Sequence, residues 1–170
     1  MKCCEIEIKL RYSRKPKIIS LFKKLGAKLE EKYQLRDSYF SFHNSMSNSH
    51  ELVRIREKGR RAELTFKGKC EDTNKIWKRT EISLDISSPE HMKNILGRLG
   101  LKLIKENVSK REIYRLGRLE IAFIQFLKPR KINLIELEGP KKLINAALAK
   151  LGNLVKKVGE ETFATFDNAK

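Results

Sequence analysis

Charged and apolar residues alternate along several short stretches of the chain, and the first of these lies at the N-terminus. Within residues 1–12, apolar residues separate three charged ones, Glu5, Glu7 and Lys9. Because successive side chains of a β-strand point to opposite faces, this segment is predicted to be a strand with one charged and one apolar face. For a single strand, the pattern is also typical of a polar face that solvent covers.

The alternation recurs in four later segments, which cover residues 52–58, 63–67, 76–86 and 134–138. The charged residues that alternate with apolar ones there are Arg54, Arg56, Glu63, Lys67, Arg79, Glu81, Glu136 and Glu138. If the charged faces of these strands meet inside a closed sheet, they form a polar cavity that holds both cations and carboxylates. The apolar faces would then point outward, where helices would have to cover them.

Helical spacing of the apolar residues predicts three helices to do this. The first is expected to have Ser13 as its N-cap and to end at Gly26. The second is expected to follow Ser88 and to end at Gly100, and the third to cover residues 141–151.

About eight strands are expected in all. Besides those above, they cover residues near 34–42, 107–116 and 118–127. The short connections, which include a hairpin turn at Gly59-Arg60, favour antiparallel pairing. The predicted fold class is α+β: an eight-stranded antiparallel β-barrel, or tunnel, with a polar interior and helices packed outside, in a single domain that spans residues 1–170.

The composition adds a strong positive charge to this picture. Lysine and arginine number 38 against 21 acidic residues, a net charge of +17, which predicts an anionic partner. The chain has no helix-turn-helix, zinc-finger or aromatic-basic RNA-binding signature, so duplex nucleic acid is not favoured, and a small, highly phosphorylated ligand fits the same charge.

The composition also excludes a membrane-embedded protein. Charged residues make up 35% of the chain, and no apolar run approaches the roughly 18 residues that a spanning helix needs. Cys3, Cys4 and Cys70 lack the spacing of metal ligands. Together with an N-terminus that shows no signal peptide, these cysteines predict a cytoplasmic protein.

A triphosphate bound to a divalent cation would use both kinds of charge in such a cavity. Its oxygens need cationic donors, for which the candidates are Lys9, Arg54, Arg56, Lys67, Arg79 and Arg111. Its metal needs carboxylates, for which the candidates are Glu5, Glu7, Glu136 and Glu138. The alternative is a set of salt bridges, but burying several like charges without a ligand costs several kcal/mol per ion, which favours a ligand or a water-filled cavity.

Short motifs along the chain resemble those of one known family. Glu5-Ile6-Glu7-Ile8-Lys9 matches the ExExK signature of the CYTH family, the triphosphate tunnel metalloenzymes that include class IV adenylate cyclases and thiamine triphosphatases. Further matches follow in order: Asp37-Ser38-Tyr39-Phe40, Leu52-Val53-Arg54-Ile55-Arg56, Leu64-Thr65-Phe66-Lys67-Gly68, Arg79-Thr80-Glu81 and Glu136-Leu137-Glu138. The resemblance therefore covers nearly the whole chain.

The resemblance implies a tunnel enzyme that uses Mg or Mn to act on a nucleoside triphosphate, thiamine triphosphate or tripolyphosphate. It implies metal ligation by Glu5, Glu7, Glu136 and Glu138, phosphate binding by Lys9, Arg54, Arg56, Lys67, Arg79 and Arg111, catalytic roles for Glu5, Glu7 and Lys9, and a supporting role for Glu81. The reaction is either an adenylate cyclase or a triphosphatase reaction. A homodimer is left open, as is a non-catalytic protein that binds triphosphate, polyphosphate or RNA ends.

Two positions depart from the family pattern. The family usually has Lys-x-Arg near its sixth strand, where this chain has Ser109-Lys110-Arg111. The family often carries an aspartate on its seventh strand, where this chain has Ile124. The absence of that carboxylate is expected to weaken metal binding or to remove a group that orients the reaction.

Overall fold

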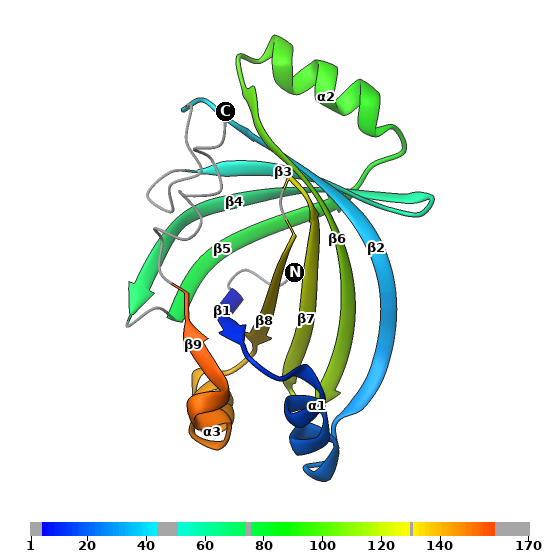
Figure 1. Ribbon diagram of the computed structural model, residues 1–170. Coiled ribbons are helices and arrows are strands. Elements are labelled where there is room, and N and C mark those ends of the chain that lie inside the picture. Colours follow the sequence, from blue (N-terminus) through cyan, green and yellow to red (C-terminus); the bar gives the residue numbers. More distant parts are fainter. Residues whose placement is uncertain (1–4, 44–50, 74–75, 130, 159–170) are drawn as a thin grey trace.

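Eight antiparallel strands close into a barrel with three helices outside it (Figure 1). The computed structural model describes residues 5–43, 51–73, 76–129 and 131–158, and of Glu5, residues 70–73 and Trp77 only the backbone. The barrel strands are β1 (Glu5–Tyr12), β2 (Lys28–Ser41), β3 (Leu52–Lys58), β4 (Arg61–Thr73), β5 (Ile76–Asp85), β6 (Lys102–Leu116), β7 (Leu119–Lys128) and β8 (Ile132–Glu138). Pairing of β1 with both β8 and β5 closes the sheet, which confirms the predicted barrel.

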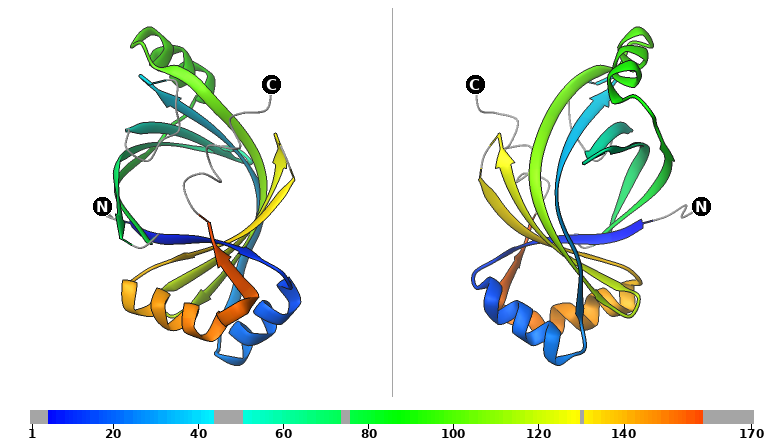
Figure 2. Two further views of the ribbon diagram at one scale, coloured as in Figure 1. Left: turned by 60° about the vertical axis from the view of Figure 1, so that its left-hand side comes forward. Right: turned by 90° about the vertical axis from the view of Figure 1, so that its right-hand side faces the viewer.

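The helices lie on two sides of the barrel. Figure 2 shows α1 (Lys15–Lys24) and α3 (Lys141–Leu151) next to each other at one side and α2 (Pro89–Arg98) at the opposite side. A short 3-10 helix, Gly152–Leu154, follows α3. Strand β9 (Val155–Lys157) then pairs with the C-terminal end of β1, residues 10–12. Within the described residues, none of the helices is long and apolar enough to cross a membrane.

The main apolar core lies between the barrel and its helices, outside the barrel. Ile18 and Phe22 of α1 and Ile144 of α3 belong to the same buried cluster as the strand residues Ile8 and Leu137. A second cluster joins Leu96 of α2 to strands β2 and β3. These strand residues alternate with the charged ones, so the predicted arrangement, with apolar faces outward under helices, is confirmed.

The start of α2 agrees with the sequence, whereas the start of α1 does not. The Ser88 hydroxyl accepts a hydrogen bond from the backbone N–H of His91 at 3.2 Å, as an N-cap does. Ser13 is not the cap of α1, because Arg14 holds that position without a side-chain cap bond. The Ser13 hydroxyl instead donates to the carbonyl of Leu154 at 3.4 Å, a contact across the fold that local sequence does not reveal.

Strands β2 and β6 are longer than their sequences predict. They have 14 and 15 residues, and they pair with each other along most of their length, from Lys28 with Arg115 to Ser41 with Lys102. The residues that precede the predicted starts, 28–33 in β2 and 102–106 in β6, are mostly polar. The apolar alternation that marks a strand is therefore weak there. Pairing between two distant segments, which sequence patterns do not report, sets these strand ends.

The inverted core predicts different costs for two leucines that both point outward from barrel strands. Leu137 is fully buried beneath the helices, whereas Leu84 is 52% exposed. Leu137→Ala should lower the free energy of unfolding by about 2–5 kcal/mol, because it leaves a cavity in a packed core. The matched change Leu84→Ala should cost about 1 kcal/mol or less.

Urea unfolding of both variants and the parent chain measures this difference. Equal losses for Leu137→Ala and Leu84→Ala would contradict a core that lies under α1 and α3.

Candidate functional site

The inner faces of β1 and β8 bring together four predicted site residues. Glu7 lies opposite Glu138, and Lys9 lies opposite Glu136 in the antiparallel register. The Lys9 ammonium donates a short hydrogen bond to Glu7 and lies 3.2 Å from Oε2 of Glu136. Arg111 of β6 approaches the same carboxylate, with Nη1 at 3.7 Å from Oε1. Strands far apart in sequence thus converge on one buried ionic cluster.

These contacts keep the cluster ionised in spite of burial. Burial would raise the pKa of Glu136, but the charges of Lys9 and Arg111 outweigh it and lower that pKa to about 2. Burial would lower the pKa of Lys9, but Glu136 and Glu7 outweigh it and raise that pKa above its usual value. Both groups therefore carry full charge across the physiological pH range.

A second group of charges lies on β3, β4 and β5. Lys67 donates a short hydrogen bond to Glu81, which it faces in the register of the two strands. Burial lowers the pKa of Lys67 to about 8, and the positive charge of Arg54 adds to this effect, while Glu81 and Glu7 oppose it. Since charges on β1 and β3 both act on Lys67, these side chains share one interior.

Arg56 is held by an aspartate rather than left open. Its Nε and Nη2 donate to the two carboxylate oxygens of Asp37 at 2.7 and 2.8 Å. Burial would raise the pKa of Asp37, but Arg56 outweighs it and lowers that pKa to about 2. Such a two-fold pair is rigid, so Arg56 faces the interior with a fixed guanidinium plane.

Three other arginines keep buried donors without partners. In the described part of the chain, Nε of Arg54, Nε and Nη2 of Arg79 and Nε of Arg111 are buried and make no hydrogen bond. Arg54 does donate through Nη2 to Glu63 at 3.2 Å and to Thr65 at 3.0 Å. Buried donors without acceptors are costly, so these N–H groups are suited to an anion that enters the barrel.

Part of the interior is apolar, which the prediction of a polar interior did not anticipate. Ile113, Ala122 and Ile124 form a buried cluster, with Tyr33 and Phe126 packed against it. Ile124 lies between Arg111 and Leu134 in register, so it faces inward from β7. An eight-stranded barrel is narrow enough for side chains to fill it, and here they fill one side. Position 124 therefore contributes an apolar side chain to the interior where the family pattern has a carboxylate.

Two charged residues of the interior were not among the predicted site residues. Asp37 was noted only as part of a motif, although it sets the position of Arg56. Glu120 on β7 pairs in register with Glu138 and is bound by Arg115 at 2.7 Å. Burial raises the pKa of Glu120, and the negative charge of Glu138 raises it further. The alternation of Glu120, Ala122 and Ile124 along β7 could have marked it as inward-facing.

The carboxylates of β1 and β8 are of the type that binds divalent cations, but their described side chains are not grouped as metal ligands. Glu7, Glu136 and Glu138 offer the oxygen donors that Mg and Mn prefer, on two neighbouring strands. The backbone of Glu5 belongs to β1, but its side chain lies outside the described part, as do those of the three cysteines. Among the side chains that are described, no three of His, Cys, Asp or Glu lie close enough together to hold a metal ion.

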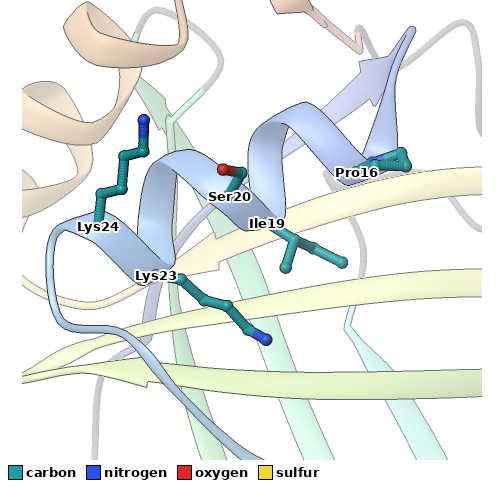
Figure 3. A pocket seen from close by; sticks show the side chains of 5 residues that line it. All are labelled: Pro16, Ile19, Ser20, Lys23 and Lys24. Atoms are coloured by element: carbon teal, nitrogen blue, oxygen red, sulfur yellow. The ribbon is translucent and has the colours of Figure 1, made fainter.

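A depression of about 600 Å³ on the outer surface does not compete with the barrel as a site. Its lining comes from α1: Pro16, Ile19, Ser20, Lys23 and Lys24. Figure 3 shows that Lys23 and Lys24 point in opposite directions from the helix, so their charges do not converge on a ligand.

Comparison with known proteins agrees with this geometry. The model of the CYTH domain family matches residues 4–161. The chain belongs to the CYTH domain family. A protein of Methanocaldococcus jannaschii, named for an inferred adenylate cyclase activity, is 35% identical over 113 residues. That alignment covers 65% of this chain and 63% of the relative, so the match spans less than two thirds of the relative's length.

Solved structures of other proteins have a similar fold. A Pyrococcus horikoshii protein superposes with a TM-score of 0.74 at 24% identity, covering 89% of this chain and 94% of that one. An adenylyl cyclase-like protein of Hippeastrum, described as having a dominant triphosphatase activity, superposes with a TM-score of 0.67 at 17% identity, covering 95% and 94%. At these identities the likeness establishes the fold alone.

The lowered pKa of Lys67 predicts a pH-dependent affinity for anions. Below about pH 8 the side chain is an ammonium ion that can bind phosphate oxygens, and above it this charge is lost. Without metal, tripolyphosphate should bind roughly tenfold more weakly at about pH 9 than at about pH 7, because one pH unit above its pKa only about a tenth of Lys67 is protonated.

Isothermal titration calorimetry measures this, with Lys67→Arg as the matched control. The guanidinium stays charged throughout, so the variant should lack the step. A parent chain whose affinity follows the same pH curve as Lys67→Arg would contradict the prediction.

Proposed function

We propose that this chain is a metal-dependent enzyme that acts on a triphosphate inside its barrel. The observation that carries the proposal is the set of unpartnered N–H groups on Arg54, Arg79 and Arg111, buried in a closed barrel. Phosphate oxygens are the acceptors that fit such donors, since a guanidinium can bind two of them at once. Lys67 adds a fourth cationic group that faces the same interior.

The two kinds of charge lie on different parts of the barrel wall. The unpartnered donors come from β3, β5 and β6, and the carboxylates Glu7, Glu136 and Glu138 come from β1 and β8. A Mg or Mn ion bound by these carboxylates, together with Glu5, would neutralise phosphate charge. The arginines of β3, β5 and β6 would bind the phosphate oxygens. The phosphorus atoms would then lie between these arginines and the metal ion on β1 and β8.

The same side chains serve either of two reactions. In a cyclase reaction, a ribose hydroxyl attacks the α-phosphorus and pyrophosphate leaves, and the arginines stabilise the charge that gathers on the leaving group. In a triphosphatase reaction, water attacks the terminal phosphorus, and the same donors stabilise the transferred phosphoryl group. The names of the relatives include both activities, and the substrate is a nucleoside triphosphate, thiamine triphosphate or tripolyphosphate.

A non-catalytic protein that binds triphosphate, polyphosphate or RNA ends is the second candidate. It is favoured by Ile124, which faces the interior within an apolar cluster where a carboxylate is expected. Such a protein would bind a triphosphate tightly and leave it intact. The cytoplasmic location and the homodimer stay predictions under both candidates.

Turnover assays with ATP, tripolyphosphate and thiamine triphosphate, each with Mg or Mn, test the proposal. At least one substrate should be converted, to cyclic AMP and pyrophosphate or to phosphate and a diphosphate. Arg79→Ala should lower kcat/KM by about 10- to 100-fold, which corresponds to the loss of hydrogen bonds to a charged group. Arg61→Ala removes the same charge from an exposed position and should change kcat/KM less than about twofold.

Tight binding of a triphosphate without turnover of any substrate would favour the binding protein. Turnover that Arg79→Ala leaves unchanged would contradict the assignment of the barrel interior as the active site.

A further inference from the structure

Asp37 and Arg56 meet in the interior because the strand register places them opposite each other on β2 and β3. Ile55, the neighbour of Arg56, belongs to the cluster beneath α2 outside the barrel, so Arg56 itself points inward. The Asp37 side chain is 2% exposed and that of Arg56 is 20% exposed. The aspartate is therefore covered, while part of the guanidinium stays open to the interior.

The aspartate binds only one edge of the guanidinium. An arginine has five N–H donors in one plane, and Asp37 accepts from one on Nε and one on Nη2 of Arg56. A second edge, formed by one N–H on each Nη, points away from Asp37 because the donors of a guanidinium diverge. This second edge has the geometry that binds two phosphate oxygens at once.

The charge of Arg56 also reaches the carboxylate side of the barrel. Burial would raise the pKa of Glu136 on β8, and the cations that lower that pKa to about 2 are Lys9, Arg111 and Arg56. Because Arg56 acts on carboxylates of both β2 and β8, its guanidinium lies within the shared interior. A phosphate group inside the barrel would meet the second edge of this guanidinium.

The arginines of this interior need a counter-ion, because like charges repel one another in a partly buried site. Burial would raise the pKa of Asp37, but the charge of Arg56 outweighs this effect. The charges of Arg54 and Arg111 lower that pKa further, to about 2. Asp37 therefore stays ionised across the physiological pH range and serves as a permanent counter-ion for three arginines.

We infer that Asp37 is a positioning residue, which orients the guanidinium of Arg56 so that its second edge is ready for the phosphate oxygens of the substrate. Asp37 makes no contact with the substrate and acts only through Arg56. An arginine that is ordered before the ligand arrives loses less conformational entropy on binding, so the clamp raises affinity. The inference rests on the proposed function of the same site.

Two substitutions that keep every charge test this role. Asp37→Glu moves the carboxylate by one methylene and so displaces the guanidinium, whereas Arg56→Lys keeps the cation but removes its planar fork. Metal-free tripolyphosphate should bind about tenfold more weakly to Asp37→Glu than to the parent chain. When Arg56→Lys is already present, adding Asp37→Glu should change the affinity less than about twofold, because no fork is left to orient.

Isothermal titration calorimetry measures the four affinities, and circular dichroism establishes which variants are folded. Glu57→Asp is the matched control: it shifts a carboxylate by the same methylene in an ion pair with Lys93 of α2, outside the barrel. It should change the affinity less than about twofold.

If Asp37→Glu does not fold, Asp37→Asn takes its place in the same cycle. Loss of the negative charge then favours anion binding whether or not Arg56→Lys is present, so the comparison is between the two effects. The effect of Asp37→Asn should be at least about fivefold less favourable to binding with Arg56 intact than with Arg56→Lys.

A merely structural role of Asp37 would lower stability and leave the affinity of the folded variant unchanged, which would overturn the inference. An equal loss of affinity with and without Arg56→Lys would overturn it too, because Asp37 would then act without Arg56. Tight binding without turnover of any triphosphate would contradict the proposed enzyme and not the role of Asp37. A parent chain that does not bind tripolyphosphate would contradict both.

Discussion

Charges buried inside a closed barrel must be neutralised within it, and this constraint organises the interior. Among the described residues, each buried carboxylate forms a salt bridge: Glu136 with Lys9, Asp37 with Arg56 and Glu81 with Lys67. Cations exceed what these pairs consume, and the excess remains as arginine N–H groups without acceptors. The buried carboxylates therefore have cationic partners, whereas several arginine N–H donors have no acceptor. Such an interior is suited to an added anion.

The arrangement of faces could be predicted from sequence because it depends only on alternation. Charged residues two apart in β1 and in β8 had to share a face, and apolar residues between them had to share the other. The closed sheet then followed from one requirement, that both faces be covered. The hydroxyl cap at Ser88 was also predictable, because it too is a local feature: it joins residues only three apart in the sequence.

What could not be predicted depends on register between distant strands. The clamp of Arg56 by Asp37 joins β3 to β2, and the contact of Glu120 with Glu138 joins β7 to β8. Ile124 was recognised as unusual, but the apolar cluster around it requires neighbours from β2 and β6. Ser13 is not the cap because the helix begins one residue later, after Arg14, while both the N–H and the hydroxyl of Ser13 donate to the carbonyl of Leu154, far along the chain. Each of these contacts joins segments that are far apart in the sequence.

Strand β1 has an unusual number of partners, since it pairs with β5, β8 and β9. During synthesis on the ribosome, the edge of β1 that pairs with β8 stays open until β8 has emerged, more than 100 residues later, so the barrel cannot close before then. Delayed pairing between distant segments is slow and exposes strand edges to other chains. Nascent chains of this protein should therefore depend on chaperones more than a helical protein of equal length does.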